Sequence, residues 1–131
     1  MTRLALICLG GAFGTGARYL LGGLVGRWMG PDFPSGTLLV NVLGSFLIGL
    51  VQQVGLTSLA IPETLRLVLA VGVMGGFTTY SSFSYETIRL IEQGSWIAAG
   101  LYVVLTTALC LGGCAVGLSL GRLLIEGRGG W

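Results

Sequence analysis

The stretch Gly75-Gly76-Phe77-Thr78-Thr79-Tyr80-Ser81-Ser82-Phe83 decides the fold of this chain. It lies midway along an apolar segment, residues 65–91, that is otherwise long enough to cross a bilayer. Adjacent glycines followed by β-branched threonines form helix poorly, since each glycine costs about 1 kcal/mol relative to alanine. Backbone groups freed in hydrocarbon must find partners in protein or in an aqueous cavity. The stretch therefore predicts a transmembrane helix broken at Gly75–Thr79.

A second interpretation of the same residues is a glycine notch for close helix packing. Five hydroxyl groups crowd this place, on Thr78, Thr79, Tyr80, Ser81 and Ser82. In an unbroken helix the serine and threonine hydroxyls could bond back to carbonyls of the preceding turn. The sequence leaves both interpretations open.

The composition of the 131 residues is that of a membrane protein. Hydrophobic residues make up 53% and charged residues 9%, whereas about 25% charged is usual in soluble domains. The mean hydropathy is +0.90. The net charge of +2 is too small and too scattered to predict nucleic-acid binding.

Four membrane spans are predicted, over residues 4–26, 36–54, 65–91 and 96–120, and they form one domain over residues 1–131. Residues 28–34 and 93–95 provide the turns after the first and third spans. The chain is therefore expected to be an all-α integral membrane protein with both termini on one side.

Small residues predict close contacts between these helices. Glycine contributes 24 residues, and three of them, Gly113, Gly117 and Gly121, form a small-xxx-small repeat in the fourth span. Gly10, Gly11 and Gly14 give the first span a similar face. The three cysteines lie in apolar surroundings and are interpreted as buried small residues.

Polar side chains recur every four residues along the second span, at Thr37, Asn41, Ser45 and Gln53, with Gly49 between the last two. An amide at mid-membrane must hydrogen-bond something, so Asn41 is either interhelical glue or part of a functional site. Tyr102, Thr106 and Cys110 form a stripe on the fourth span. Tyr80 and Phe83 share a face after the predicted break, a spacing that more often reflects packing than function.

The residues exclude some functions and leave others open. Histidine is absent and no nucleophile–base pair is found, so an enzyme is not expected. A channel, a proton-coupled exporter and a membrane scaffold remain, and four helices enclose too little volume without a second subunit. An exporter normally needs a mid-membrane carboxylate, whereas Glu86 lies well after the break. Hydroxyls, an amide and ring edges suit a small anion, while freed carbonyls suit a hard cation.

The arginines predict little preference for one orientation. Arg3, Arg66, Arg122 and Arg128 lie on one side of the predicted spans, and Arg27 and Arg89 lie on the other. Arg18 lies within the first span. A positive-inside bias as weak as this allows insertion in both directions.

Three motifs together resemble the CrcB/Fluc family of fluoride channels. They are the first-span pattern from Gly10-Gly11 through Gly14 to Arg18-Tyr19, residues 36–46 (GTLLVNVLGSF) and residues 75–83. The resemblance covers essentially the whole chain. It implies a dual-topology antiparallel homodimer with two fluoride pores, embedded in the lipid of a prokaryotic inner or plasma membrane. It also implies a structural sodium ion (Na⁺) at the dimer centre, and a passive route by which the cell sheds toxic fluoride.

The resemblance also implies roles for individual residues. Asn41 would donate to the ion in the pore, the edge of the Phe83 ring would face fluoride, and Arg18 would line the aqueous mouth. Tyr80 stands where the family usually has a second phenylalanine, so either its ring edge or its hydroxyl would face the ion. The main-chain carbonyls of Gly75 and Thr78 would bind sodium. Further candidates for the pore are Thr37, Ser81, Glu86, Tyr102 and Thr106.

Overall fold

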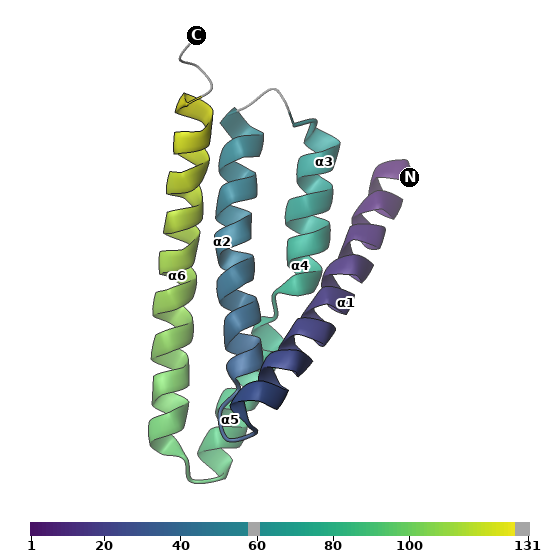
Figure 1. The fold of residues 1–131 in the computed structure, drawn as a ribbon. Helices are drawn as coiled ribbons and strands as arrows, with labels where there is room; N and C mark the ends of the chain where they lie inside the picture. The colour runs from purple at the N-terminus through teal and green to yellow at the C-terminus, as the bar shows by residue number, and fades with distance from the viewer. Residues whose placement is uncertain (58–60, 128–131) are drawn as a thin grey trace.

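A computed structural model describes residues 1–57 and 61–127, which form four membrane-spanning segments (Figure 1). All four segments are long and apolar enough to cross a membrane. The elements are α1 (Thr2–Met29), α2 (Ser35–Thr57), α3 (Glu63–Leu67), the π-helical stretch η1 (Val68–Val73), α4 (Met74–Phe77), α5 (Tyr80–Glu92) and α6 (Trp96–Glu126). The prediction of an all-helical chain with four spans is confirmed for the described part of the chain. Arg128 and the rest of the C-terminal tail lie outside the described residues.

The helices run up and down, so the start of α1 and the end of α6 lie at the same end of the bundle (Figure 1). We call this the terminal end, and the opposite end, where α1 joins α2 and α5 joins α6, the loop end. Each helix extends beyond its predicted span; α6, for example, continues to Glu126 instead of residue 120. The additional turns carry the polar residues that meet the membrane surfaces.

The third segment is broken, but the break is shorter than the predicted Gly75–Thr79. Gly75 and Gly76 remain helical within α4, and only Thr78 and Thr79 are extended, with φ/ψ of −81°/155° and −150°/112°. Glycine lowers helix propensity, but packing of α4 against α1 overrides that preference. Before the break the helix widens into π-helix over η1, which the sequence pattern did not predict.

Two glycines with positive φ shape the loop end. Gly30 ends α1 with φ of 85°, and Gly94 turns the chain from α5 into α6 with φ of 77°. The Gly94 and Ser95 amides donate to the carbonyls of Ile91 and Leu90 at 2.9 Å each, which closes the end of α5. The predicted turn at residues 93–95 is confirmed, and the turn predicted at residues 28–34 begins two residues later, because α1 continues to Met29.

Glycines bring α1 against the third segment at backbone distance. A Cβ added to Gly10 would lie 2.9 Å from the Val68 carbonyl oxygen, and one added to Gly72 would lie 2.6 Å from that of Ile7. A Cβ at Gly76 would collide with the Gly11 carbonyl oxygen. The packing notch and the broken helix, alternatives in the sequence, are therefore both present: the notch at Gly76 and the break at Thr78–Thr79.

A second glycine seam joins α2 to α6, which lie side by side along most of their length (Figure 1). The predicted repeat Gly113, Gly117 and Gly121 faces α2, and a Cβ on Gly117 would collide with the Phe46 carbonyl oxygen. The opposing Gly49 meets the Cys114 carbonyl oxygen in the same way. Close backbone approach replaces the hydrophobic effect, which is absent between helices in lipid.

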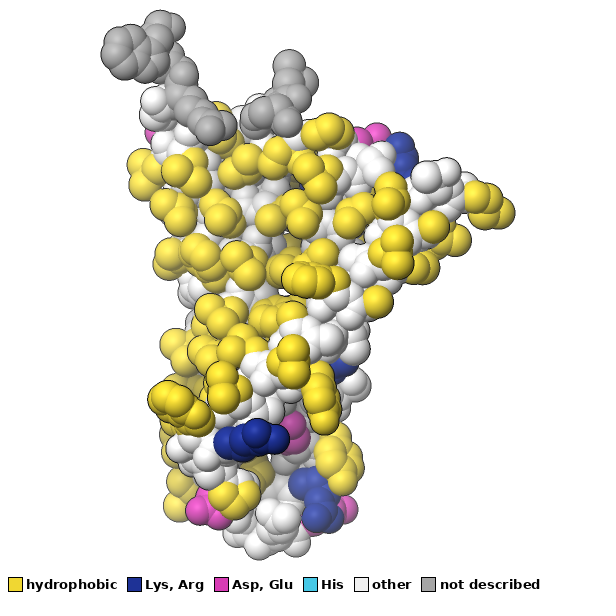
Figure 2. All heavy atoms as spheres, turned by 45° about the vertical axis from the view of Figure 1, so that its right-hand side comes forward, with side chains coloured by type: hydrophobic (Ala, Val, Ile, Leu, Met, Phe, Trp, Pro, Cys, Tyr) yellow, Lys and Arg dark blue, Asp and Glu magenta, His cyan; other side chains and the backbone are white. Residues whose placement is uncertain are grey.

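The surface of the single chain is mostly apolar. Figure 2 shows hydrophobic side chains across the middle of one face, with charged side chains at its upper edge and in its lower third. Leu9, Phe13, Ile97 and Leu111 are among the exposed large side chains. Such a surface suits lipid or a second subunit.

We predict that Gly117→Ala weakens the fold, because the new methyl group must push α2 away from α6. Overpacking of this kind typically costs about 1–3 kcal/mol. The matched control is Gly112→Ala on the same helix, where a Cβ meets nothing within 4 Å. Thermal unfolding in detergent, followed by size-exclusion chromatography, should show a lower midpoint for Gly117→Ala only. Equal midpoints for the two variants would contradict this account of the seam.

Candidate functional site

The break in the third segment is bridged by Asn41 of α2. The Asn41 Nδ2 atom donates to the Thr79 carbonyl at 3.0 Å, and the Thr79 amide donates to Asn41 Oδ1 at 2.8 Å. Both residues are buried. Asn41 thus satisfies the backbone donor and acceptor of one unwound residue and keeps a second Nδ2–H for another acceptor.

Thr79 is the hub of the hydroxyl groups beside the break. Its Oγ1 caps α5 by accepting from the Ser82 amide at 3.2 Å, and it donates to Ser82 Oγ at 3.1 Å. The Ser81 Oγ lies 3.2 Å from the same atom. Thr78 instead bonds back to the Met74 carbonyl at 2.9 Å. The predicted hydroxyl cluster therefore has two roles: the Thr79 hydroxyl caps the helix that follows the break, and the Thr78 hydroxyl bonds back to the helix that precedes it.

The break also frees backbone carbonyls. In a continuous helix the Gly75 and Thr78 carbonyls would accept from the amides of Thr79 and Ser82. Those amides donate to Asn41 Oδ1 and Thr79 Oγ1 instead. Within residues 1–57 and 61–127, neither carbonyl accepts a hydrogen bond outside regular helix pairing. Gly75 is exposed in the single chain.

Glu86 joins α2, α5 and α6 through its carboxylate. Thr37 Oγ1 donates to its Oε1 at 2.7 Å, and the Tyr102 hydroxyl donates to its Oε2 at 2.6 Å. Tyr102 is completely buried, while Glu86 and Thr37 are half-buried. Short bonds to both oxygens compensate for the cost of placing this charge inside the bundle.

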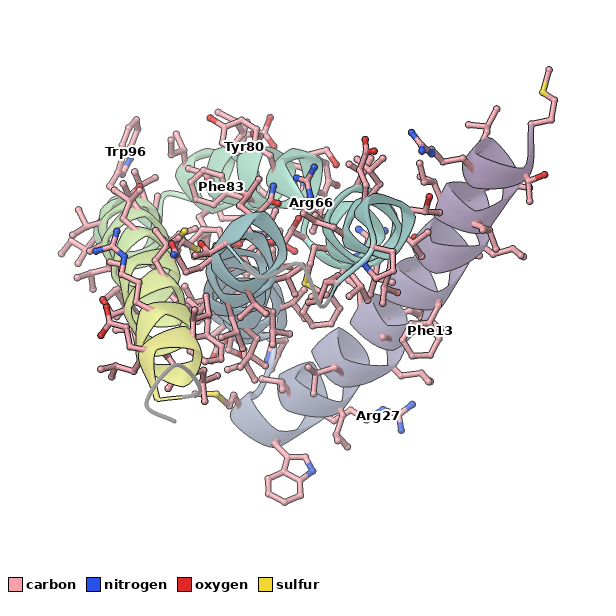
Figure 3. The ribbon with its side chains drawn as sticks, turned by 90° about the horizontal axis from the view of Figure 1, so that it is seen from above. Phe13, Arg27, Arg66, Tyr80, Phe83 and Trp96 are labelled. Carbon is pink, nitrogen blue, oxygen red and sulfur yellow. The ribbon has the colours of Figure 1, made fainter. Side chains whose placement is uncertain are left out.

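Aromatic rings extend from the break towards Glu86. The centroids of Tyr80 and Phe83 lie 5.5 Å apart, those of Phe83 and Tyr102 5.2 Å, and those of Tyr102 and Phe33 5.5 Å. Figure 3 shows Phe83 turned towards the bundle and Tyr80 on its outer side. Tyr80 is 79% exposed in the single chain, so it is not buried packing within this subunit.

A groove of about 1100 Å³ opens between α1, the start of α2 and α5, towards the loop end. Its walls include Arg18 and Tyr19 from α1, Thr37 from α2, and Thr79, Ser82, Tyr85, Glu86 and Arg89 from the region after the break. Arg89 forms an ion pair with Glu92 at 3.6 Å. A half-buried Arg18 facing hydroxyl groups across a groove of this size forms a site that can attract a small anion.

The structure brings the predicted residues into three groups. The first group adjoins the break and consists of Asn41, Thr78 and Ser81. The second group is the network of hydrogen bonds and ring contacts beyond the break, formed by Thr37, Tyr80, Phe83, Glu86 and Tyr102. The third group is Arg18 alone, on the α1 wall of the groove. Thr106 is buried one turn after Tyr102, and its hydroxyl has no partner among the described residues. Sequence reasoning missed Ser82 as a groove-lining residue, although Thr79 is of a residue type that is common at helix N-caps, where its side chain accepts from the amide three residues later.

Comparison with known proteins identifies the family. The model for "CrcB-like protein, Camphor Resistance (CrcB)" matches residues 5–118. The chain belongs to the CrcB family. This confirms the resemblance found in the three sequence motifs.

Several curated proteins are similar to this chain over most of their own length. A protein of Anaeromyxobacter sp. strain K is 60% identical over 85% of this chain and 88% of its own. A protein of Sorangium cellulosum is 50% identical over 97% of this chain and 100% of its own. One of Geobacter sulfurreducens is 48% identical over 95% of this chain and 100% of its own. Each of the three is named fluoride-specific ion channel FluC.

Proposed function

We propose that this chain forms a fluoride-specific ion channel, through which a bacterial cell loses fluoride passively. The observation that carries the proposal is 50–60% identity to proteins named as fluoride-specific channels, over at least 85% of this chain. The membrane is the inner or plasma membrane of the cell. The polar groups around the break support the proposal because they suit a small anion.

Fluoride is small and strongly hydrated, so a selective path must replace its water with closely spaced donors. Asn41 has one N–H left after bridging Thr79, and the hydroxyls of Ser81 and Ser82 both form hydrogen bonds with the Thr79 hydroxyl. The positive edges of the Phe83 and Tyr80 rings continue this series. Several weak sites in succession allow the ion to bind and still leave.

Arg18 would collect anions at the groove, and a polar path would continue along Thr37, Glu86, Tyr102 and Thr106. The hydroxyls of Thr37 and Tyr102 already donate to Glu86, so a passing anion must compete with this carboxylate for them. This competition keeps binding weak, as conduction requires. Glu86 with two donors in place is also a poor candidate for the proton carrier of an exporter.

We infer that the working unit is an antiparallel homodimer of dual topology. Gly75 and Tyr80, beside the break, are exposed in the single chain, and one side of the groove is open. A second copy would cover these residues and complete the path, giving two pores in the dimer. The weak arginine bias between the two ends is compatible with both orientations.

A structural sodium ion fits the carbonyls of Gly75 and Thr78. Both oxygens lose their helical donors because Asn41 and Thr79 take the Thr79 and Ser82 amides. Neutral carbonyl oxygens are suitable ligands for a hard cation. Two carbonyls from each subunit would hold the ion at the dimer centre, where it would fix the two breaks relative to each other.

The decisive experiment is ion efflux from liposomes that contain the purified protein, with fluoride and chloride measured separately. We expect rapid fluoride efflux and negligible chloride efflux. Asn41→Asp should still assemble, though with lower stability, because a carboxylate oxygen accepts from the Thr79 amide while the Thr79 carbonyl loses its donor; fluoride efflux per assembled protein should be lost. The substitution removes both N–H donors and adds a negative charge facing the anion. Normal efflux through Asn41→Asp would show that Asn41 only joins helices and does not contact the ion. Absence of fluoride efflux through the wild-type protein would contradict the proposed function.

The aromatic pair provides a second prediction. Phe83→Ile keeps most of the apolar volume, so as a packing change it should cost no more than about 1.5 kcal/mol. It removes the positive ring edge, however, and should reduce fluoride efflux severely in an intact dimer. Tyr80→Phe is the matched variant, because it keeps the ring and removes only the hydroxyl.

We expect Tyr80→Phe to conduct well, with efflux normalised to reconstituted dimer. Normal efflux in Phe83→Ile would show that the rings only fill space. Loss of efflux in Tyr80→Phe would show that the hydroxyl serves as a donor in place of a ring edge.

Dual topology gives a third prediction. A cysteine at position 2, placed in a variant lacking Cys8, Cys110 and Cys114, should react with an impermeant thiol reagent from both sides of the membrane. About half of the label should be accessible from each side, because the weak arginine bias does not select one orientation. Labelling confined to one side would exclude the antiparallel dimer without affecting the fluoride proposal.

A further inference from the structure

Arg66 is a basic side chain that the proposed pore does not use. It is the fourth residue of the span Glu63–Glu92, so it lies about 5 Å from the start of that helix, at headgroup depth. It belongs to the terminal end of the bundle, and Figure 3 shows it between α2 and the α3–α4 segment. Its side chain is half-buried.

The side chain of Arg66 is held against α2 at two points. Its Nη1 atom donates to the Gln52 Oε1 atom at 3.2 Å. Its aliphatic stem crosses Gly55, where an added Cβ would lie 2.6 Å from Cδ and 2.9 Å from Cγ. Ordering a long side chain costs rotamer entropy, so a guanidinium fixed in this way is prepared for a ligand.

No carboxylate neutralises Arg66 within the part of the chain that the structure describes. Glu63, one turn earlier on the same helix, pairs instead with Arg3 at 3.6 Å. Gln52 is neutral and occupies one of the five guanidinium donors. A half-buried cation whose remaining donors have no partner among residues 1–57 and 61–127 can bind an anion with several oxygen atoms at the membrane surface.

We propose that Arg66 binds the phosphate of an anionic membrane lipid. The planar guanidinium matches two phosphate oxygens, and lipid phosphates lie at the depth of Arg66 in a bilayer. The two ends of the chain differ accordingly. The loop end has exposed Trp28 and Trp96, whose rings can rest at the interface beside Arg27 and Arg89, whereas the terminal end has no tryptophan among the described residues.

The test is native mass spectrometry of the full-length protein in detergent, titrated with phosphatidylglycerol, phosphatidylcholine or inorganic phosphate. We expect wild-type protein to bind phosphatidylglycerol best, and Arg66→Gln to bind it about fivefold more weakly, the usual effect of one basic residue at an anionic bilayer. Arg66→Lys keeps the charge but not the planar fork, so it should bind more weakly than wild type but more tightly than Arg66→Gln. Arg122→Gln, an exposed arginine on α6 at the same end, is the matched control and should change binding by less than twofold.

Four results would overturn the proposal. They are unchanged phosphatidylglycerol binding in Arg66→Gln, an equal loss in Arg122→Gln, an equal loss in Arg66→Lys, and displacement of the lipid by inorganic phosphate at the same concentration. The last would identify a site for a soluble anion. Fluoride efflux should persist in Arg66→Gln, which verifies that the variant is folded and keeps this test separate from that of the channel.

Discussion

The structure depends on one constraint: a residue unwound inside a bilayer must have its backbone amide and carbonyl satisfied by protein. The unwound residue is Thr79, and Asn41 meets both needs with one amide side chain. Because both residues are buried, losing either bond would leave a polar group without a partner, at a cost of about 1–3 kcal/mol. The first role of Asn41 is therefore to hold the unwound backbone, and only its remaining N–H is available to an ion in the proposed path.

Close packing keeps the break in place. Gly76 against Gly11 fixes α4 on α1, and Gly36 against Gly22 fixes α2 on the same helix, so that Asn41 is held opposite Thr79. Larger side chains at these contacts would separate the helices by more than a hydrogen bond can span. The function proposed for a few polar atoms thus relies on glycines far from them in sequence.

The same bonds that satisfy the break also prepare its chemistry. When the Thr79 and Ser82 amides turn to Asn41 and Thr79 Oγ1, the Gly75 and Thr78 carbonyls lose their helical donors, and these are the oxygens to which we assign the proposed cation. Donors for an anion and acceptors for a cation therefore arise from one rearrangement of the backbone. The exposure of Tyr80, beside the break in the isolated chain, explains why a second subunit is part of the proposal.

The sequence by itself determined four apolar spans, a broken third helix, glycine seams and the family, because hydropathy, helix propensity and motifs are local properties. It placed the break too early, since Gly75 and Gly76 have low helix propensity but are kept helical by contacts with α1. Only the tertiary structure decided that Asn41 bridges Thr79 and that Glu86 receives Thr37 and Tyr102. Those pairs join residues 16 to 49 positions apart, and their meeting depends on how the helices cross.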